Sequence, residues 1–98
     1  MEVPFESEKL TRVETDLMFN NGLDQAIVKA FRKRIQVIRA APDERDFYAL
    51  KSLHFEKLKG DREGQNSMRL NDQWRLILKF EKTESGKLVV VISISDYH

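Results

Sequence analysis

The chain has 98 residues, the length of a single domain, and we expect one domain over residues 1–98. A hydrophobic content of 41% is enough for one core and excludes a disordered tail. The absence of cysteine excludes a disulfide scaffold, thiol catalysis and thiolate zinc sites. Because the sequence has neither a long apolar run nor the pattern of a secretory signal, we expect a soluble, cytoplasmic protein without a membrane partner.

The charged residues are unevenly distributed along the chain. In total, 17 lysines and arginines face 16 aspartates and glutamates, and the net charge of +1 by itself argues against nucleic-acid binding. Residues 1–24 carry a net charge of −4, however, whereas residues 25–48 and 49–82 each carry +3 and residues 83–98 carry −1. A basic stripe on one surface is what a phosphate backbone requires. The alternative is that mixed charges simply solvate a small protein.

The first half of the chain predicts mostly helices. The expected elements are a short edge strand over residues 3–5, a short helix over 6–17, a long helix from 24 to about 41, and a short helix or turn over 43–50. Asp24 suits the N-cap of the long helix, and Pro42 ends it. The apolar residues of this helix recur at spacings of four, four and three and predict a stripe that faces the core: Ile27, Phe31, Ile35 and Ile38.

The second half predicts strands separated by short polar connections. The expected strands are residues 52–57, 65–70, 74–81 and 87–95. Connections this short favour antiparallel hairpins. Helices followed by strands indicate an α+β domain, in which two or three N-terminal helices pack on a mostly antiparallel sheet of about four strands.

Strand alternation predicts that two arginines lie together. If Leu70 pairs with Trp74, both apolar rows face one core, and Arg69 lies opposite Arg75 on the other face. Like charges across a strand pair are unfavourable unless the side chains splay into water or an anion lies between them. Long arginine stems can also serve to cover apolar surface. Two guanidiniums directed at one point would nevertheless suit a phosphate, which they can bind bidentately.

The last three residues, Asp96, Tyr97 and His98, carry three different proton-handling groups. An imidazole titrates near neutrality and suits general acid or base catalysis. A tyrosine hydroxyl can orient a nucleophile, and a carboxylate can fix a histidine tautomer or accept a proton. A frayed terminus with an accidental histidine is the alternative.

Three motifs follow one another at hairpin spacing. They are L-K-G-x-x-x-G over residues 58–64, S-x-R-x-N-D-Q-W-R over 67–75, and D-Y-H over 96–98. Together they resemble the HigB toxins of the RelE/ParE superfamily, over about residues 50–98, while the N-terminal half is similar only in layout. The resemblance implies a RelE-like toxin of a type II toxin–antitoxin system. Such a toxin is a ribosome-dependent mRNA endonuclease that inhibits translation by metal-independent attack of a 2′-hydroxyl, without a cofactor.

The resemblance also implies roles for individual residues. Positions that the family uses for catalysis or RNA binding are matched by Lys59, Arg75, Asp96, Tyr97 and His98. Lys57 and Arg69 are expected to contact RNA. Several family members have a histidine at the position of Glu56, which makes Glu56 a candidate general base. His54 is a second candidate, because a residue two positions earlier lies on the same face of an extended strand; an ordinary core or surface histidine is the alternative.

The expected partners follow from the same resemblance. They are a HigA-like helix-turn-helix antitoxin, the ribosome and mRNA, with a toxin that is monomeric alone and heterotetrameric with its antitoxin. Two other functions stay open: a ParE-like toxin of the same fold that inhibits DNA gyrase without cleaving RNA, and an inactive relative that only binds an antitoxin. The terminal D-Y-H favours the nuclease, whereas Glu56 in place of the histidine keeps the inactive relative open.

Overall fold

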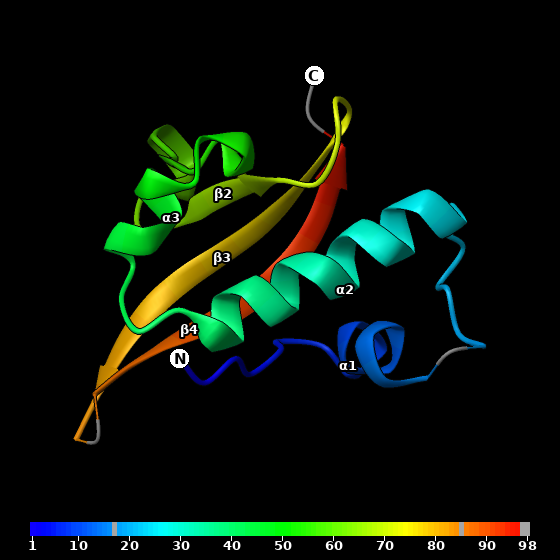
Figure 1. The fold of residues 1–98 in the computed structure, drawn as a ribbon, viewed down its shortest axis with the longest axis horizontal. Helices are drawn as coiled ribbons and strands as arrows, with labels where there is room; N and C mark the ends of the chain where they lie inside the picture. The colour runs from blue at the N-terminus through cyan, green and yellow to red at the C-terminus, as the bar shows by residue number, and fades with distance from the viewer. Residues whose placement is uncertain (17, 85, 97–98) are drawn as a thin grey trace.

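The computed structural model describes residues 1–16, 18–84 and 86–96, which form three α-helices beside one antiparallel sheet (Figure 1). The sheet has the strand order β1-β2-β3-β4. The elements are α1 (Glu8–Thr15), α2 (Gln25–Ala40), α3 (Arg45–Ala49), β1 (Glu56–Lys57), β2 (Asn66–Arg69), β3 (Trp74–Thr83) and β4 (Gly86–Asp96), with 3₁₀ turns η1 (Lys51–Leu53) and η2 (Gly60–Arg62). The predicted α+β architecture is therefore confirmed. No helix in these residues is both long enough and apolar enough to cross a membrane.

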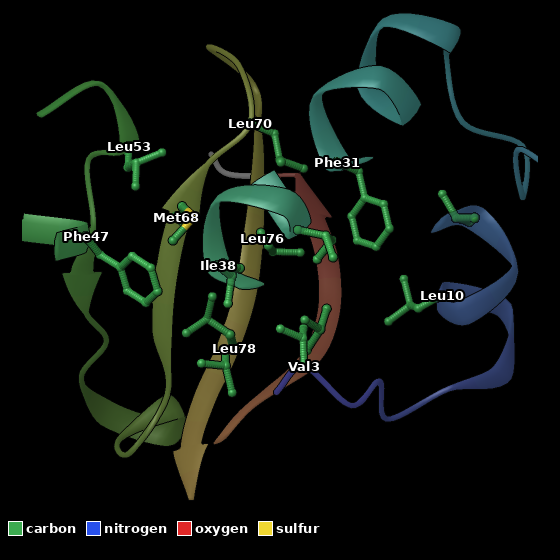
Figure 2. Packing of buried hydrophobic residues seen from close by; sticks show 14 of the residues in the cluster. Val3, Leu10, Phe31, Ile38, Phe47, Leu53, Met68, Leu70, Leu76 and Leu78 are labelled. Carbon is green, nitrogen blue, oxygen red and sulfur yellow. The ribbon is translucent and has the colours of Figure 1, made fainter. Parts of the chain in front are cut away.

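The long helix α2 crosses one face of the sheet and forms the centre of the core (Figures 1 and 2). It begins as the sequence predicts, because the Asp24 carboxylate accepts a hydrogen bond of 3.0 Å from the Ala26 N–H. All four residues of the predicted apolar stripe are buried, together with Val28. They meet apolar side chains from one face of the sheet: Met68, Leu70, Leu76, Leu78, Val89 and Val91. The opposite face of the sheet carries Ser67, Arg69 and Arg75, together with the buried Ile77.

Phe31 is the largest side chain in this stripe, and its substitution tests the core. It is fully buried, and its ring centroid lies 6.0 Å from that of Phe5. Replacing Phe31 with alanine should lower the free energy of unfolding by about 3–5 kcal/mol, because the cavity adds to the lost transfer energy. Urea unfolding followed by circular dichroism measures this loss. Lys33→Ala, at an exposed position of the same helix, should change the value by less than about 0.5 kcal/mol. Equal losses for the two variants would contradict this description of the core.

Basic residues of α2 attach the acidic N-terminal segment. Arg32 donates hydrogen bonds of 2.9 and 3.0 Å to the carbonyl oxygens of Val13 and Asp16 at the end of α1. Arg39 forms a two-pronged ion pair with Glu14, a carboxylate that is only 7% exposed. Part of the basic middle of the chain therefore neutralises the acidic head, and the cationic surface is smaller than the segment charges indicate.

Two short elements differ from the sequence predictions. The first predicted strand, residues 52–57, is wrong in its first half: residues 51–53 form η1, and only Glu56 and Lys57 are extended. Leu53 is 2% exposed in the core, and His54 then reverses the backbone in the left-handed region, with φ of 46°. At the other edge, residues 2–5 make isolated parallel bridges to β4 instead of a continuous strand.

Candidate active site

The hairpin between β2 and β3 places two arginines side by side on the sheet face opposite α2. Arg69 and Arg75 are partners in the strand register, and the Leu70 N–H bonds the Trp74 carbonyl at 2.9 Å. The predicted pairing is therefore confirmed. The Asn71 carboxamide oxygen fixes the turn, because it accepts hydrogen bonds from two successive backbone N–H groups, those of Gln73 at 2.9 Å and Trp74 at 2.8 Å.

Arg75 is buried and held from several sides. One guanidinium nitrogen, Nη2, donates to the His54 carbonyl oxygen at 2.5 Å and to the Ser67 hydroxyl at 2.7 Å. The same nitrogen lies 3.7 Å from the Glu56 carboxylate. Since the residue is only 9% exposed, its charge is fixed in position. A cation fixed in this way can stabilise a developing negative charge without reorganisation.

Arg69 has a different set of partners, so the two guanidiniums do not simply splay into water. One of its nitrogens pairs with Asp72 of the turn, and the other lies 3.3 Å from His54 Nε2. Its carbonyl oxygen accepts a hydrogen bond of 2.8 Å from Arg34 of α2. Burial and the neighbouring charge of Arg69 lower the pKa of Arg34. The end of the β2–β3 hairpin therefore holds three arginines, Arg34, Arg69 and Arg75, with Asp72 as a counter-charge for Arg69.

Glu56 and His54, the two candidate general bases, both lie at this arginine pair. Glu56 is the register partner of Ser67, whose hydroxyl is 3.4 Å from its carboxylate, and it shares the face of Arg75. The Glu56 side chain is 48% exposed and can meet a substrate. His54 also reaches the site, but for another reason than strand alternation. Its left-handed backbone directs its carbonyl oxygen to Arg75 and its imidazole ring to Arg69.

Asp96 lies where the end of β4 meets the β2–β3 turn (Figure 1). It is the register partner of Trp74, and its carboxylate accepts a hydrogen bond of 3.0 Å from the Gln73 side-chain amide. The structure thus brings Asp96 to the same end of the sheet as Arg69. Tyr97 and His98, the other two residues of the terminal motif, lie outside the described residues.

Lys57 and Lys59 line a different surface. Lys57 is the register partner of Asn66, so it points to the face opposite that of Glu56. Both lysines line a hollow of about 820 Å³ near β1, whereas Arg75 lies on the other face of the sheet. The adjoining loop needs the two glycines of the L-K-G-x-x-x-G motif, because Gly60 and Gly64 have φ of 69° and 90°.

Sequence reasoning gave no role to three residues that contact the site. Ser67 shares the strand parity of Arg69, so alternation alone could have identified it. Asp72 and Gln73 stand within the hairpin motif, but their partners, Arg69 and Asp96, depend on the folded turn. Within residues 1–16, 18–84 and 86–96, no three side chains among histidine, cysteine, aspartate and glutamate gather closely enough to hold a metal ion.

Several solved structures share this architecture along nearly the whole chain. The YoeB/ParE toxin from Agrobacterium tumefaciens has 19% sequence identity and a TM-score of 0.62, with all of both chains covered. In the YoeB–YefM complex from Staphylococcus aureus, the matching chain has 20% identity and a TM-score of 0.59, covering 100% of this chain and 97% of the other. YafQ from E. coli BL21(DE3) has 15% identity and a TM-score of 0.56, covering 97% and 91%. The likeness defines a RelE-like toxin fold.

The family model of HigB-like toxins, described as RelE-like toxins of type II toxin–antitoxin systems, matches residues 4–98. The chain therefore belongs to the HigB-like family of toxins, within the RelE/ParE superfamily. A search of curated protein sequences found no significant match.

Proposed function

We propose that this toxin is a ribosome-dependent endoribonuclease that cleaves mRNA. The observation that carries the proposal is the cluster of Arg75, Arg69, Glu56 and His54 on one sheet face. The cluster combines fixed cations for a phosphate with groups that can accept a proton. Membership of the HigB-like family supports the same activity.

The first step is attack of a ribose 2′-hydroxyl on the adjacent phosphorus. Glu56 takes the hydroxyl proton, because its carboxylate is accessible and lies 3.7 Å from Arg75. The new O2′–P bond forms as the P–O5′ bond breaks, which leaves a 2′,3′-cyclic phosphate and a free 5′-hydroxyl. This reaction uses only the RNA and protein side chains, so we propose no metal and no cofactor.

The second requirement is stabilisation of charge. Arg75 faces the extra negative charge on the phosphate oxygens, and Arg69 assists after it releases Asp72. The departing O5′ needs a proton, for which His98 is our candidate, with Asp96 orienting it. Tyr97 orients the substrate or stacks on a base. Lys59 and Lys57 supply further positive charge along the RNA.

The partners that we propose are those of a toxin–antitoxin pair. An antitoxin of the helix-turn-helix type would restrain the toxin, with a heterotetramer as the proposed complex, and the ribosome would present the mRNA in the cytoplasm. A net charge of +1 gives only a weak long-range attraction to RNA. Since the ribosome already holds the substrate, a weak attraction is sufficient for this mode of action.

His98→Ala provides the direct test. Expression of the unaltered chain should stop growth and produce cleavage within translated codons, seen by primer extension on cellular mRNA. His98→Ala should lower this cleavage by about 10²-fold or more, as expected for loss of a general acid. Accumulation to the level of the unaltered chain controls for folding. Undiminished cleavage by the variant would remove His98 from the site.

The same samples distinguish the other functions. A ParE-like toxin would inhibit supercoiling by DNA gyrase and leave mRNA intact. An inactive relative would do neither, and it would not stop growth without its antitoxin. Either result would contradict the nuclease proposal.

A further inference from the structure

The hollow beside β1 has the composition of a nucleotide site. It has a volume of about 820 Å³, and it lies on the helix side of the sheet, between β1, the η2 loop and the start of α3. Among its lining residues are two lysines, an aromatic ring and an amide: Lys57, Lys59, Phe80 and Asn66. An aromatic face stacks on nucleobases, an amide can bond to a base edge, and lysines bind phosphates.

Asn66 is the residue that points most clearly to a ligand. It is only 6% exposed, yet its side chain makes no hydrogen bond to any part of the chain that the structure describes. Its backbone is occupied by pairing with both neighbouring strands. Neither polar atom of the carboxamide is among the fully buried, unpaired side-chain atoms of the described residues, so the carboxamide reaches the solvent of the hollow that it lines. The carboxamide at the wall of the hollow is therefore available to a bound group.

The charge of the hollow favours an anionic ligand. Glu44 lies in an ion pair with Lys87, with Nζ 2.6 Å from the carboxylate, so its charge is already compensated. Neither Lys57 nor Lys59 takes part in an ion pair within residues 1–16, 18–84 and 86–96. Among the lining residues, these two lysines outnumber the remaining carboxylate, that of Glu63.

The hollow is also next to the proposed reaction centre along the chain. Glu56 and Lys57 are consecutive in β1, so their side chains lie on opposite faces of the sheet edge. An RNA strand that crosses this edge would meet the carboxylate on one side and the hollow on the other. This inference rests on the proposed cleavage of RNA.

We propose that the hollow binds one nucleotide of the RNA next to the cleaved bond. The base stacks on Phe80, its edge bonds to the Asn66 carboxamide, and Lys57 and Lys59 contact the flanking phosphates. The site would therefore contribute to which sequences are cleaved.

Nucleotide binding tests the site independently of cleavage. The full chain carrying Glu56→Gln is titrated with AMP, GMP, CMP and UMP separately and then with inorganic phosphate, followed by NMR of backbone and side-chain amides. At least one nucleotide should give saturable shifts at the Asn66 side-chain amide and at residues 59–64, and phosphate alone should leave the Asn66 amide unmoved. Asn66→Leu and Phe80→Leu should each weaken binding roughly fivefold or more, the value of one hydrogen bond or stacking contact.

A control variant outside the hollow tests whether the loss of nucleotide binding is specific. Gln36→Ala alters an amide in a separate hollow on α2 and should leave nucleotide binding unchanged. Equal shifts with inorganic phosphate would reduce the hollow to an anion site and overturn base binding. Protection of the same amides by the antitoxin, with no effect of nucleotides, would assign the surface to a protein partner and also overturn it. Nucleotide binding combined with a complete lack of mRNA cleavage by the unaltered chain would contradict the proposed function instead.

Discussion

Glu56→Gln should lower the rate of mRNA cleavage by about 10²–10⁴-fold, the usual contribution of a general base. The amide keeps the size of the side chain but cannot accept the 2′-hydroxyl proton. The protein should still fold, because the side chain is 48% exposed and its contact with Ser67 is a long one of 3.4 Å. Single-turnover cleavage of ribosome-bound mRNA, with the protein in excess, measures the chemical step directly.

Two further variants make the Glu56 result specific. Glu81→Gln removes an exposed carboxylate from the far part of β3, where it pairs with Lys79, and should leave the rate unchanged. His54→Gln tests the other candidate base, which lies 3.3 Å from Arg69. A normal rate for Glu56→Gln combined with a large loss for His54→Gln would transfer the role of base to His54.

Arg75 should be the residue on which both activity and stability depend. Arg75→Ala should reduce cleavage by at least about 10²–10³-fold, the cost of losing one donor to a developing oxyanion. It should also lower the free energy of unfolding by about 1–3 kcal/mol, because the buried Ser67 hydroxyl and the His54 carbonyl lose their donor. Urea unfolding and single-turnover cleavage measure the two effects separately.

Arg75→Lys separates charge from geometry. Lysine keeps the positive charge but cannot hold several acceptors in one plane, so we expect a folded protein that still cleaves at least about 10-fold more slowly. Arg45→Ala removes a well-exposed arginine that pairs with Asp43, and it should change neither quantity. A folded Arg75→Lys protein that cleaves at the unaltered rate would remove the fixed guanidinium from the mechanism.

The charge balance of the chain shows where sequence reasoning succeeds and where it stops. Segment charges indicate an acidic head and a basic middle, and both exist in the sequence. In the folded protein, Arg32 donates a hydrogen bond to a backbone carbonyl of α1, and Arg39 forms an ion pair with Glu14. Such partners are 16 to 25 residues apart, and no local pattern identifies them.

The sequence by itself determined the features that depend on period and register. The stripe of α2 repeats with the helical period, and Asp24 caps the helix through a contact two residues away. The pairing of Arg69 with Arg75 follows from the requirement that the apolar residues of β2 and β3 face the same core. A shift of the pairing by one residue would expose the apolar side chains of one strand.

The tertiary structure alone decided which candidate residues meet. His54 lies beside the two arginines because its own backbone is left-handed, directly after the buried Leu53. Strand alternation predicted the same position for a different reason. Lys59, which the family resemblance groups with Arg75, lines the hollow on the other side of β1, as does Lys57, which was expected to contact RNA. Only three-dimensional packing determines where the irregular segment after η1 ends and the two-residue strand β1 begins. This boundary decides on which face of the sheet each side chain of β1 lies.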